Sequence, residues 1–163
     1  MTNEFTNNTS LCDILNIRYP IIMAPMFLIS NANMLIEAIN SGITGCVPAH
    51  NYRTDSQFRD AIKMIRKKAT GPIGVNLIVN KSNIKFKQQL KSCLELKIDY
   101  IITSLGSPEK TINACKPLGI KVFCDVIDVK YALKVQGLGC DAIIAVNKEA
   151  GGHAGPIPAK TLI

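Results

Sequence analysis

A glycine-rich turn with one histidine is the stretch of this chain whose residue types could do chemistry. It runs Glu149-Ala150-Gly151-Gly152-His153-Ala154-Gly155 and follows the apolar run 142–146. Glycine has no Cβ, so such a turn lets the backbone approach a ligand closely. Histidine titrates near neutral pH and can exchange a proton with a bound molecule. The turn is therefore a candidate active-site loop, and the alternative is a surface turn with an incidental histidine.

Six short apolar runs alternate with segments of helical spacing along the chain. The runs are 21–23, 44–47, 73–77, 100–103, 122–126 and 142–146. Nearly all of their residues are apolar, which is typical of parallel strands buried on both faces. Between the runs, apolar residues recur at helical spacing, as at Ala32, Leu35, Ile36 and Ile39. This alternation predicts an α/β fold with a parallel sheet, either an open doubly wound sheet or a (β/α)8 barrel.

Signals for helix ends agree with this division. Residues 54–57 have the pattern of a capping box, and Ser107 before Pro108 is typical of a helix N-cap. Glycines come where helices should end before the next strand, at Gly42, Gly119 and Gly139. No linker divides residues 1–163, which indicates a single domain in which residues 1–10 are loosely held.

The composition is that of a globular chain. Hydrophobic residues make up 47% and charged residues 19%, which argues against disorder. The net charge is +7, but the basic residues are scattered along the expected helices apart from the cluster at 66–68, so we expect no nucleic-acid partner. The six cysteines form no CxxC pair, so we expect free thiols and no metal site. Without a signal-peptide pattern or an apolar run of about 18 residues, we expect a cytoplasmic protein with no membrane partner.

Polar or backbone-permissive residues follow nearly every expected strand. In both candidate architectures, ligands bind beyond the carboxyl ends of the strands. The residues found there, in chain order, are Ala24, Pro25, Met26, His50, Asn76, Ser104, Gly106, Asp125, Asn147 and the turn at 149–155. Because they come from all six strands, the sequence predicts a binding site on this rim.

Three of these segments resemble the nitronate monooxygenase family, formerly called 2-nitropropane dioxygenases. Residues 19–26 resemble its opening strand, residues 74–77 its third-strand motif, and residues 139–155 its sixth-strand signature. The family is a flavin-dependent TIM barrel of the (β/α)8 type. FMN-dependent enoyl-acyl-carrier-protein reductases share this fold and a very similar Gly-Gly-His turn, so both activities stay open.

The resemblance implies an FMN site and a role for each matching residue. The turn after the first strand would lie along the flavin ring through backbone contacts, Asn76 would hydrogen-bond the flavin, and the paired glycines would let the chain pass close to it. Asp125 takes a ring-proximal position whose role varies in the family. The implied cofactor-binding residues are Ala24, Pro25, Met26, Asn76, Asp125, Gly151 and Gly152.

His153 would be the catalytic residue, facing the nitro or nitronate group of the substrate. A histidine there can take a proton from the α-carbon, and its cation can hold the anionic oxygens. The implied reaction is the oxidation of nitronates or nitroalkanes by O2 to carbonyl compounds and nitrite. The alternatives are enoyl reduction on the same scaffold and an inactive fragment. His50 lies on the same rim, and we expect a supporting role for it.

A complete barrel of this type has about 250 residues, and this chain has 163. We therefore expect a barrel truncated to about six βα units, the N-terminal two-thirds of the family's length, without the phosphate-binding loops after strands seven and eight. Open sheet edges expose apolar surface. We expect the chain to self-associate through these edges or to complete its barrel with another polypeptide, which light scattering would detect.

Overall fold

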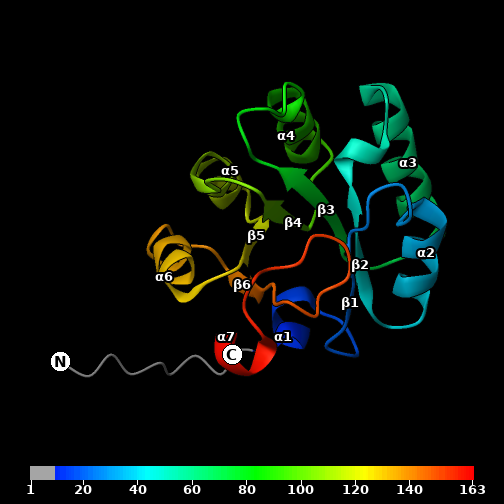
Figure 1. Ribbon diagram of the computed structural model, residues 1–163. Coiled ribbons are helices and arrows are strands. Elements are labelled where there is room, and N and C mark those ends of the chain that lie inside the picture. The colour runs from blue at the N-terminus through cyan, green and yellow to red at the C-terminus, as the bar shows by residue number, and fades with distance from the viewer. Residues whose placement is uncertain (1–9) are drawn as a thin grey trace.

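A six-stranded parallel sheet forms the centre of the protein, as a computed structural model describing residues 10–163 shows (Figure 1). The strands are β1 (Ile22–Met23), β2 (Thr44–Pro48), β3 (Ile73–Ile78), β4 (Tyr100–Ser104), β5 (Lys121–Val126) and β6 (Ala142–Ala145). The helices are α1 (Leu11–Leu15), α2 (Ala32–Asn40), α3 (Asp55–Lys68), α4 (Phe86–Glu95), α5 (Glu109–Cys115), α6 (Val129–Gly137) and α7 (Ala159–Leu162), with short 3-10 helices η1 (Ala49–Asn51) and η2 (Lys116–Leu118). Each predicted strand is confirmed to within one residue at either end.

The order of the strands decides between the two predicted architectures. They lie side by side in chain order from β1 to β6, and every neighbouring pair is parallel. A doubly wound sheet would reverse its order part-way and carry helices on both faces. Here every crossover turns the same way, so the sheet curls with α2 to α6 on its outside (Figure 1). The fold is a six-unit part of a (β/α)8 barrel, as predicted.

Alternate residues of the strands build two apolar clusters, one on each face of the sheet. The outer cluster, between strands and helices, includes Val75, Ile101 and Val122. The concave cluster consists of Cys46, Tyr100, Ile102, Phe123 and, from α1, Leu15. The helix α1 thus covers the amino end of the concave face, a position that the sequence did not predict.

Gly74 makes room for the largest side chain of the concave cluster. It pairs with Tyr100 across β3 and β4, and a Cβ on Gly74 would lie 2.3 Å from the tyrosine ring. The ring also stacks on Phe123 with centroids 5.3 Å apart, and its hydroxyl donates to the Gly45 carbonyl oxygen at 2.7 Å. The glycine of the third-strand motif is therefore a packing requirement of the barrel interior.

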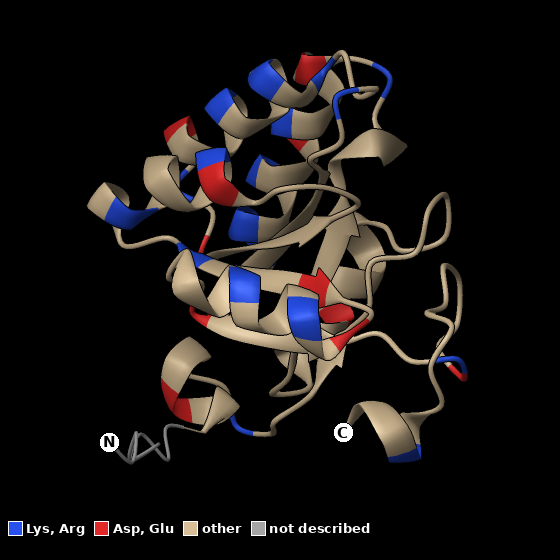
Figure 2. Cartoon of the chain, turned by 60° about the vertical axis from the view of Figure 1, so that its left-hand side comes forward, with Lys and Arg blue, Asp and Glu red and all other residues tan. Residues whose placement is uncertain are grey.

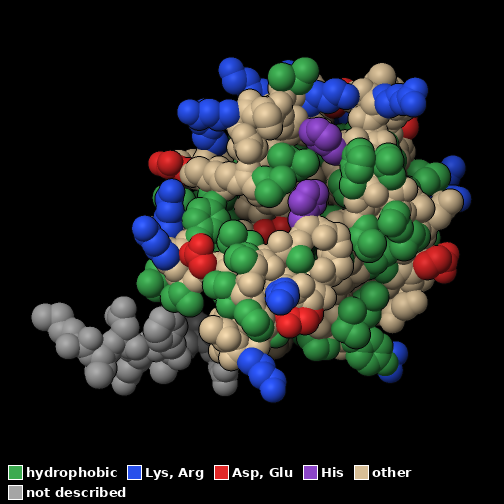
Figure 3. All heavy atoms as spheres, viewed as in Figure 1, with side chains coloured by type: hydrophobic (Ala, Val, Ile, Leu, Met, Phe, Trp, Pro, Cys, Tyr) green, Lys and Arg blue, Asp and Glu red, His purple; other side chains and the backbone are tan. Residues whose placement is uncertain are grey.

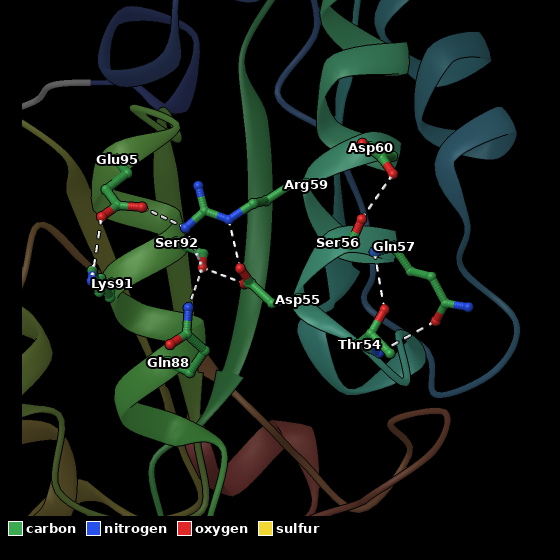
Figure 4. A network of polar contacts seen from close by, with 10 residues as sticks. All are labelled: Thr54, Asp55, Ser56, Gln57, Arg59, Asp60, Gln88, Lys91, Ser92 and Glu95. Carbon is green, nitrogen blue, oxygen red and sulfur yellow. Dashed lines mark hydrogen bonds and ion pairs between the residues drawn. The ribbon is translucent and has the colours of Figure 1, made fainter.

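A polar network joins the outer helices α3 and α4 (Figure 4). Arg59 bridges to Asp55 at 2.6 Å and to the Ser92 hydroxyl at 2.9 Å, and it also pairs with Glu95. The hydrogen bond from Ser92, followed by the contact with Arg59, lowers the pKa of the Asp55 carboxyl. Other lysine and arginine residues are spread over the outer helices (Figure 2).

Most predicted helix boundaries are confirmed. Thr54 and Gln57 form the capping box of α3, and the glycines at 42, 119 and 139 have φ of 84°, 69° and 83°, the left-handed values that end a helix. The predicted N-cap at Ser107 is wrong, because Pro108 occupies that position and α5 begins at Glu109 without a side-chain cap.

The predictions outside the sheet are only partly tested. All six cysteines are free. Within residues 10–163, no group of three acidic, cysteine or histidine side chains could hold a metal, and no helix is long and apolar enough to cross a membrane. Single-domain organisation stays a prediction, and residues 1–9 of the segment expected to be loose lie outside the described part. Self-association also stays a prediction, although the edges beside β1 and on β6 carry exposed Ile21 and Ile143.

Gly74→Ala should destabilise the protein by about 1–3 kcal/mol, because the new methyl group overlaps the Tyr100 ring. Urea unfolding measures the change. Gly137→Ala is the matched control, since nothing lies within 4 Å of its Cβ position, and it should leave stability unchanged or raise it by up to about 1 kcal/mol. Equal effects of the two substitutions would contradict the packing role of Gly74.

Candidate active site

Three polar side chains form a hydrogen-bonded row across the carboxyl ends of β3, β4 and β5. Asn76 Nδ2 donates to the Ile102 carbonyl oxygen at 3.1 Å and to Ser104 Oγ at 2.7 Å. Ser104 Oγ in turn donates to Asp125 Oδ2 at 2.5 Å. The three side chains are half-buried and lie above the apolar concave cluster, since Ile102 and Phe123 precede Ser104 and Asp125 by two residues on the same face. The structure thus brings together Asn76 and Asp125, which the sequence placed on one rim.

Burial raises the pKa of the Asp125 carboxyl above its ordinary value, and the hydrogen bond from Ser104 lowers it in part. A carboxyl group in this setting holds its proton more strongly than an exposed one. Perturbed acids of this kind are frequent at functional sites, although structural networks also produce them. The sequence identified Asp125 by its place at the strand end, but only the structure gives its partner.

The turn after β1 is fixed by a buried serine. Ser30 Oγ donates to the Ala24 carbonyl oxygen at 2.7 Å and accepts from the Met26 N–H at 2.9 Å, and Ser30 is only 1% exposed. Pro25 has no N–H. The polar backbone groups of this turn are therefore largely used within the protein, and the turn offers a ligand mainly apolar contact. Nothing in the sequence predicted this role for Ser30.

The same loop displays a run of apolar side chains that sequence reasoning missed. Phe27 and Leu28 are 61% and 73% exposed, and Leu28 has a φ of 60°, which is strained for a residue with a Cβ. Asn51 holds this conformation by accepting from the Leu28 N–H at 2.8 Å and donating to the Ser30 carbonyl oxygen at 2.8 Å. Leu105 and Ile127, from the loops after β4 and β5, are also exposed. The rim is therefore apolar as well as polar.

The glycine-rich turn after β6 is closed at its base and open at its tip. Gly155 N–H donates to the Asn147 carbonyl oxygen at 3.0 Å, and a Cβ on Gly155 would lie 2.1 Å from the Val146 oxygen. By contrast, nothing lies within 4 Å of the Cβ position of Gly151 or Gly152. Gly152 needs glycine for its φ of 77°, whereas Gly151 has no such structural reason. The space beside these two exposed residues is therefore open.

Both histidines lie on the face shown in Figure 3. His153 is exposed, and no hydrogen bond joins its ring to another residue in the part of the chain that the structure describes. His50, in η1, is exposed and lies 3.4 Å from Gln89 Nε2 through its Nδ1. His50 therefore has a protein partner, whereas His153 is available to a ligand.

Two hollows lie at the opposite, amino end of the sheet. The larger has a volume of about 620 Å³ and is lined by Leu15, Pro72, Asp99 and Lys121 among others. Asp99 there is engaged by Arg66 at 2.7 Å and by the Ile73 N–H at 2.8 Å. Because ligands of barrel proteins bind at the carboxyl ends of the strands, we place the candidate site at the rim and not in this hollow.

Comparisons with known proteins find relatives over most of this chain. Residues 8–85 match the family model described as Nitronate monooxygenase. A probable nitronate monooxygenase of Staphylococcus haemolyticus is 28% identical over 182 aligned positions, covering 91% of this chain and 51% of the relative. An octahydro-indene-carboxyl-CoA dehydrogenase of Rhodococcus jostii is 24% identical over 158 positions, covering 97% of this chain and 44% of the relative.

Solved structures of the same fold superpose on this chain. FabK from Thermotoga maritima superposes with a TM-score of 0.87 at 30% identity, covering 96% of this chain and 50% of that protein. A nitroalkane oxidase from Streptomyces ansochromogenes superposes with a TM-score of 0.79 at 21% identity, covering 89% and 50%, and shows the fold alone. The chain spans about half the length of these relatives, compared with the two-thirds expected from the motifs.

Asp125→Asn should stabilise the protein more at neutral than at acidic pH. Because the pKa of Asp125 is raised on folding, the folded state binds the proton more tightly, and the free energy of unfolding falls as pH rises from the ordinary aspartate value through the raised one. The amide removes this loss. Urea unfolding at about pH 3 and about pH 7, on either side of the ordinary aspartate range, measures the difference.

Ser104→Ala serves as the companion variant for this measurement. It removes the hydrogen bond that lowers the pKa of Asp125, so the carboxyl resonance of Asp125 should titrate at still higher pH, as followed by ¹³C NMR. A stabilisation by Asp125→Asn that is the same at both pH values would contradict the raised pKa.

Proposed function

We propose that this chain belongs to the nitronate monooxygenase family, whose model matches its residues 8–85, and that its rim binds the ring of a flavin at which nitronates or nitroalkanes are oxidised. The observation that carries this proposal is the convergence on one rim of a free acceptor on Asn76, an open glycine turn and an unengaged histidine. The partners are a small-molecule substrate and O2, and the products are a carbonyl compound and nitrite. The cytoplasmic location expected from the sequence belongs to the same proposal.

The residues present fit the ring of FMN. A planar ring needs an apolar bed, a few hydrogen-bonding groups and backbone that permits close approach. The turn at 24–26 supplies apolar contact, Asn76 supplies a hydrogen-bonding oxygen, and Gly151 and Gly152 leave space that no residue from 10 to 163 fills. The chemistry supplied by a bound flavin is acceptance of electrons from the substrate and their transfer to O2.

In this proposal, His153 handles the proton and the charge of the substrate. Its ring takes a proton from the α-carbon of a nitroalkane, and the resulting cation holds the nitro oxygens. Its exposure and its lack of a partner within the described residues favour this role over packing of the turn. Asp125 is bound to Ser104 through Oδ2 and helps to form the floor beneath the ring.

His153→Ala should lower the rate with a neutral nitroalkane by about 100-fold, as for the loss of a general base. The loss should be smaller with a preformed nitronate, which needs no deprotonation. Nitrite release by the FMN-loaded protein measures both rates. His50→Ala is the matched control, because His50 is exposed on the same face and its ring contacts Gln89, and it should lower both rates far less than His153→Ala does. Equal rates for His153→Ala and the unaltered protein would remove His153 from the mechanism.

Gly151→Ala should weaken FMN binding by about tenfold or more while changing the free energy of unfolding by less than about 0.5 kcal/mol. The added methyl group meets no protein atom within 4 Å, so only a ligand can oppose it. Fluorescence titration with FMN and urea unfolding measure the two quantities.

Gly155→Ala gives the contrasting result, because its methyl group would overlap the Val146 carbonyl oxygen. It should destabilise the protein by about 1–3 kcal/mol. Unchanged FMN affinity in Gly151→Ala would argue against a ring beside this turn.

A second candidate function is the reduction of an enoyl thioester. The Rhodococcus jostii relative is named for a carboxyl-CoA compound. Its alignment spans 158 positions, fewer than the 163 residues of this chain, whereas the alignment with the Staphylococcus haemolyticus protein spans 182 positions and therefore contains gaps in this chain. The exposed apolar side chains of the rim would suit an acyl chain. Oxidation of NADH with an enoyl thioester, and no reaction with a nitronate, would favour this function. Colourless protein that binds no added FMN would favour an inactive fragment.

A further inference from the structure

The row of Asn76, Ser104 and Asp125 has a fixed direction of hydrogen bonding. The Asn76 amide has two hydrogens, and the Ile102 carbonyl and Ser104 Oγ take one each. A carbonyl oxygen only accepts, so the amide nitrogen, and not the amide oxygen, must face Ile102. The orientation of the Asn76 amide is therefore determined by its surroundings.

Ser104 extends this direction to Asp125. Its single hydroxyl hydrogen goes to Asp125 Oδ2, which leaves the Ser104 oxygen free to accept from Asn76. Oδ2 can accept whether the carboxyl group is ionised or carries its proton on Oδ1. The half-buried carboxyl group thus sets the polarity of the whole row.

Two oxygen atoms of the row are left for a ligand. Asn76 Oδ1 and Asp125 Oδ1 have no hydrogen-bond partner within residues 10–163. An oxidised flavin ring offers one N–H donor, at N3, and its other polar ring atoms accept. Asn76 Oδ1 can only accept, and the oxygens of a nitronate also only accept, so they find no partner at Asn76.

We propose that Ser104 and Asp125 are positioning residues that hold Asn76 with its amide oxygen toward the site, where it accepts a hydrogen bond from the N3–H of the flavin ring. The assignment rests on the proposed flavin site and adds an orientation to it. The row would then hold the N3 side of the ring, and His153 would be left for the acceptor-only substrate group.

The test compares lumiflavin, which has the ring without the phosphate, with 3-methyllumiflavin, which lacks the N3–H. The unaltered chain should bind lumiflavin about tenfold more tightly, as for one lost hydrogen bond with the acceptor left unpaired. Asn76→Ala should bind both equally. Ser104→Ala should fall between them, since its amide is held by Ile102 alone. Ser107→Ala, in the loop directly after β4, should behave as the unaltered chain.

Equal affinity of the unaltered chain for the two flavins would overturn the proposal, and so would full discrimination in Ser104→Ala. Neither result requires turnover, so each is distinguishable from a failure of the proposed oxidation.

A second measurement needs no flavin. Both Asn76 amide hydrogens should exchange slowly with water by ¹⁵N NMR, and Ser104→Ala should speed one of them while Ser107→Ala speeds neither. Exchange as fast as that of an exposed asparagine in the unaltered chain would overturn the positioning role even if no flavin binds.

Discussion

Parallel pairing of the six strands in chain order places every strand-to-helix loop at one edge of the sheet. This single constraint brings residues from Ala24 to His153 onto one rim. It also requires a filled interior below that rim, because a curled sheet without side chains inside would collapse. Tyr100 fills that space over Gly74 and stacks on Phe123, so the packing of the interior supports the floor on which the polar row lies.

The sequence predicted the sheet well because burial on both faces leaves continuous apolar runs, which are visible without knowledge of the fold. It also predicted the rim, since strand ends are where those runs stop. It could not predict the partners, because these are set by register between strands. Asn76 and Ser104 are 28 residues apart, and Leu28 and Asn51 are 23 apart. The position of α1 beneath the barrel was missed for the same reason.

The structural reason for glycine differs from one motif position to the next, and this difference bears on function. Gly74 and Gly155 are required by neighbouring protein atoms, and Gly152 by its backbone conformation. Gly151 is required by nothing in the described residues. A glycine that packing requires carries little information about a ligand. Gly151 lies beside open space and near His153, so a bound molecule would explain why glycine occupies this position.

The most direct test of the central claim is to map where a flavin ring binds. Amide ¹⁵N–¹H spectra of the chain titrated with lumiflavin should shift at 24–26, at Asn76 and at 151–153, on three separate strand ends of one rim. Shifts confined to the amino end, around Pro72, Asp99 and Lys121 in the larger hollow, or no saturable shifts at all, would contradict a flavin site at the carboxyl ends of these strands.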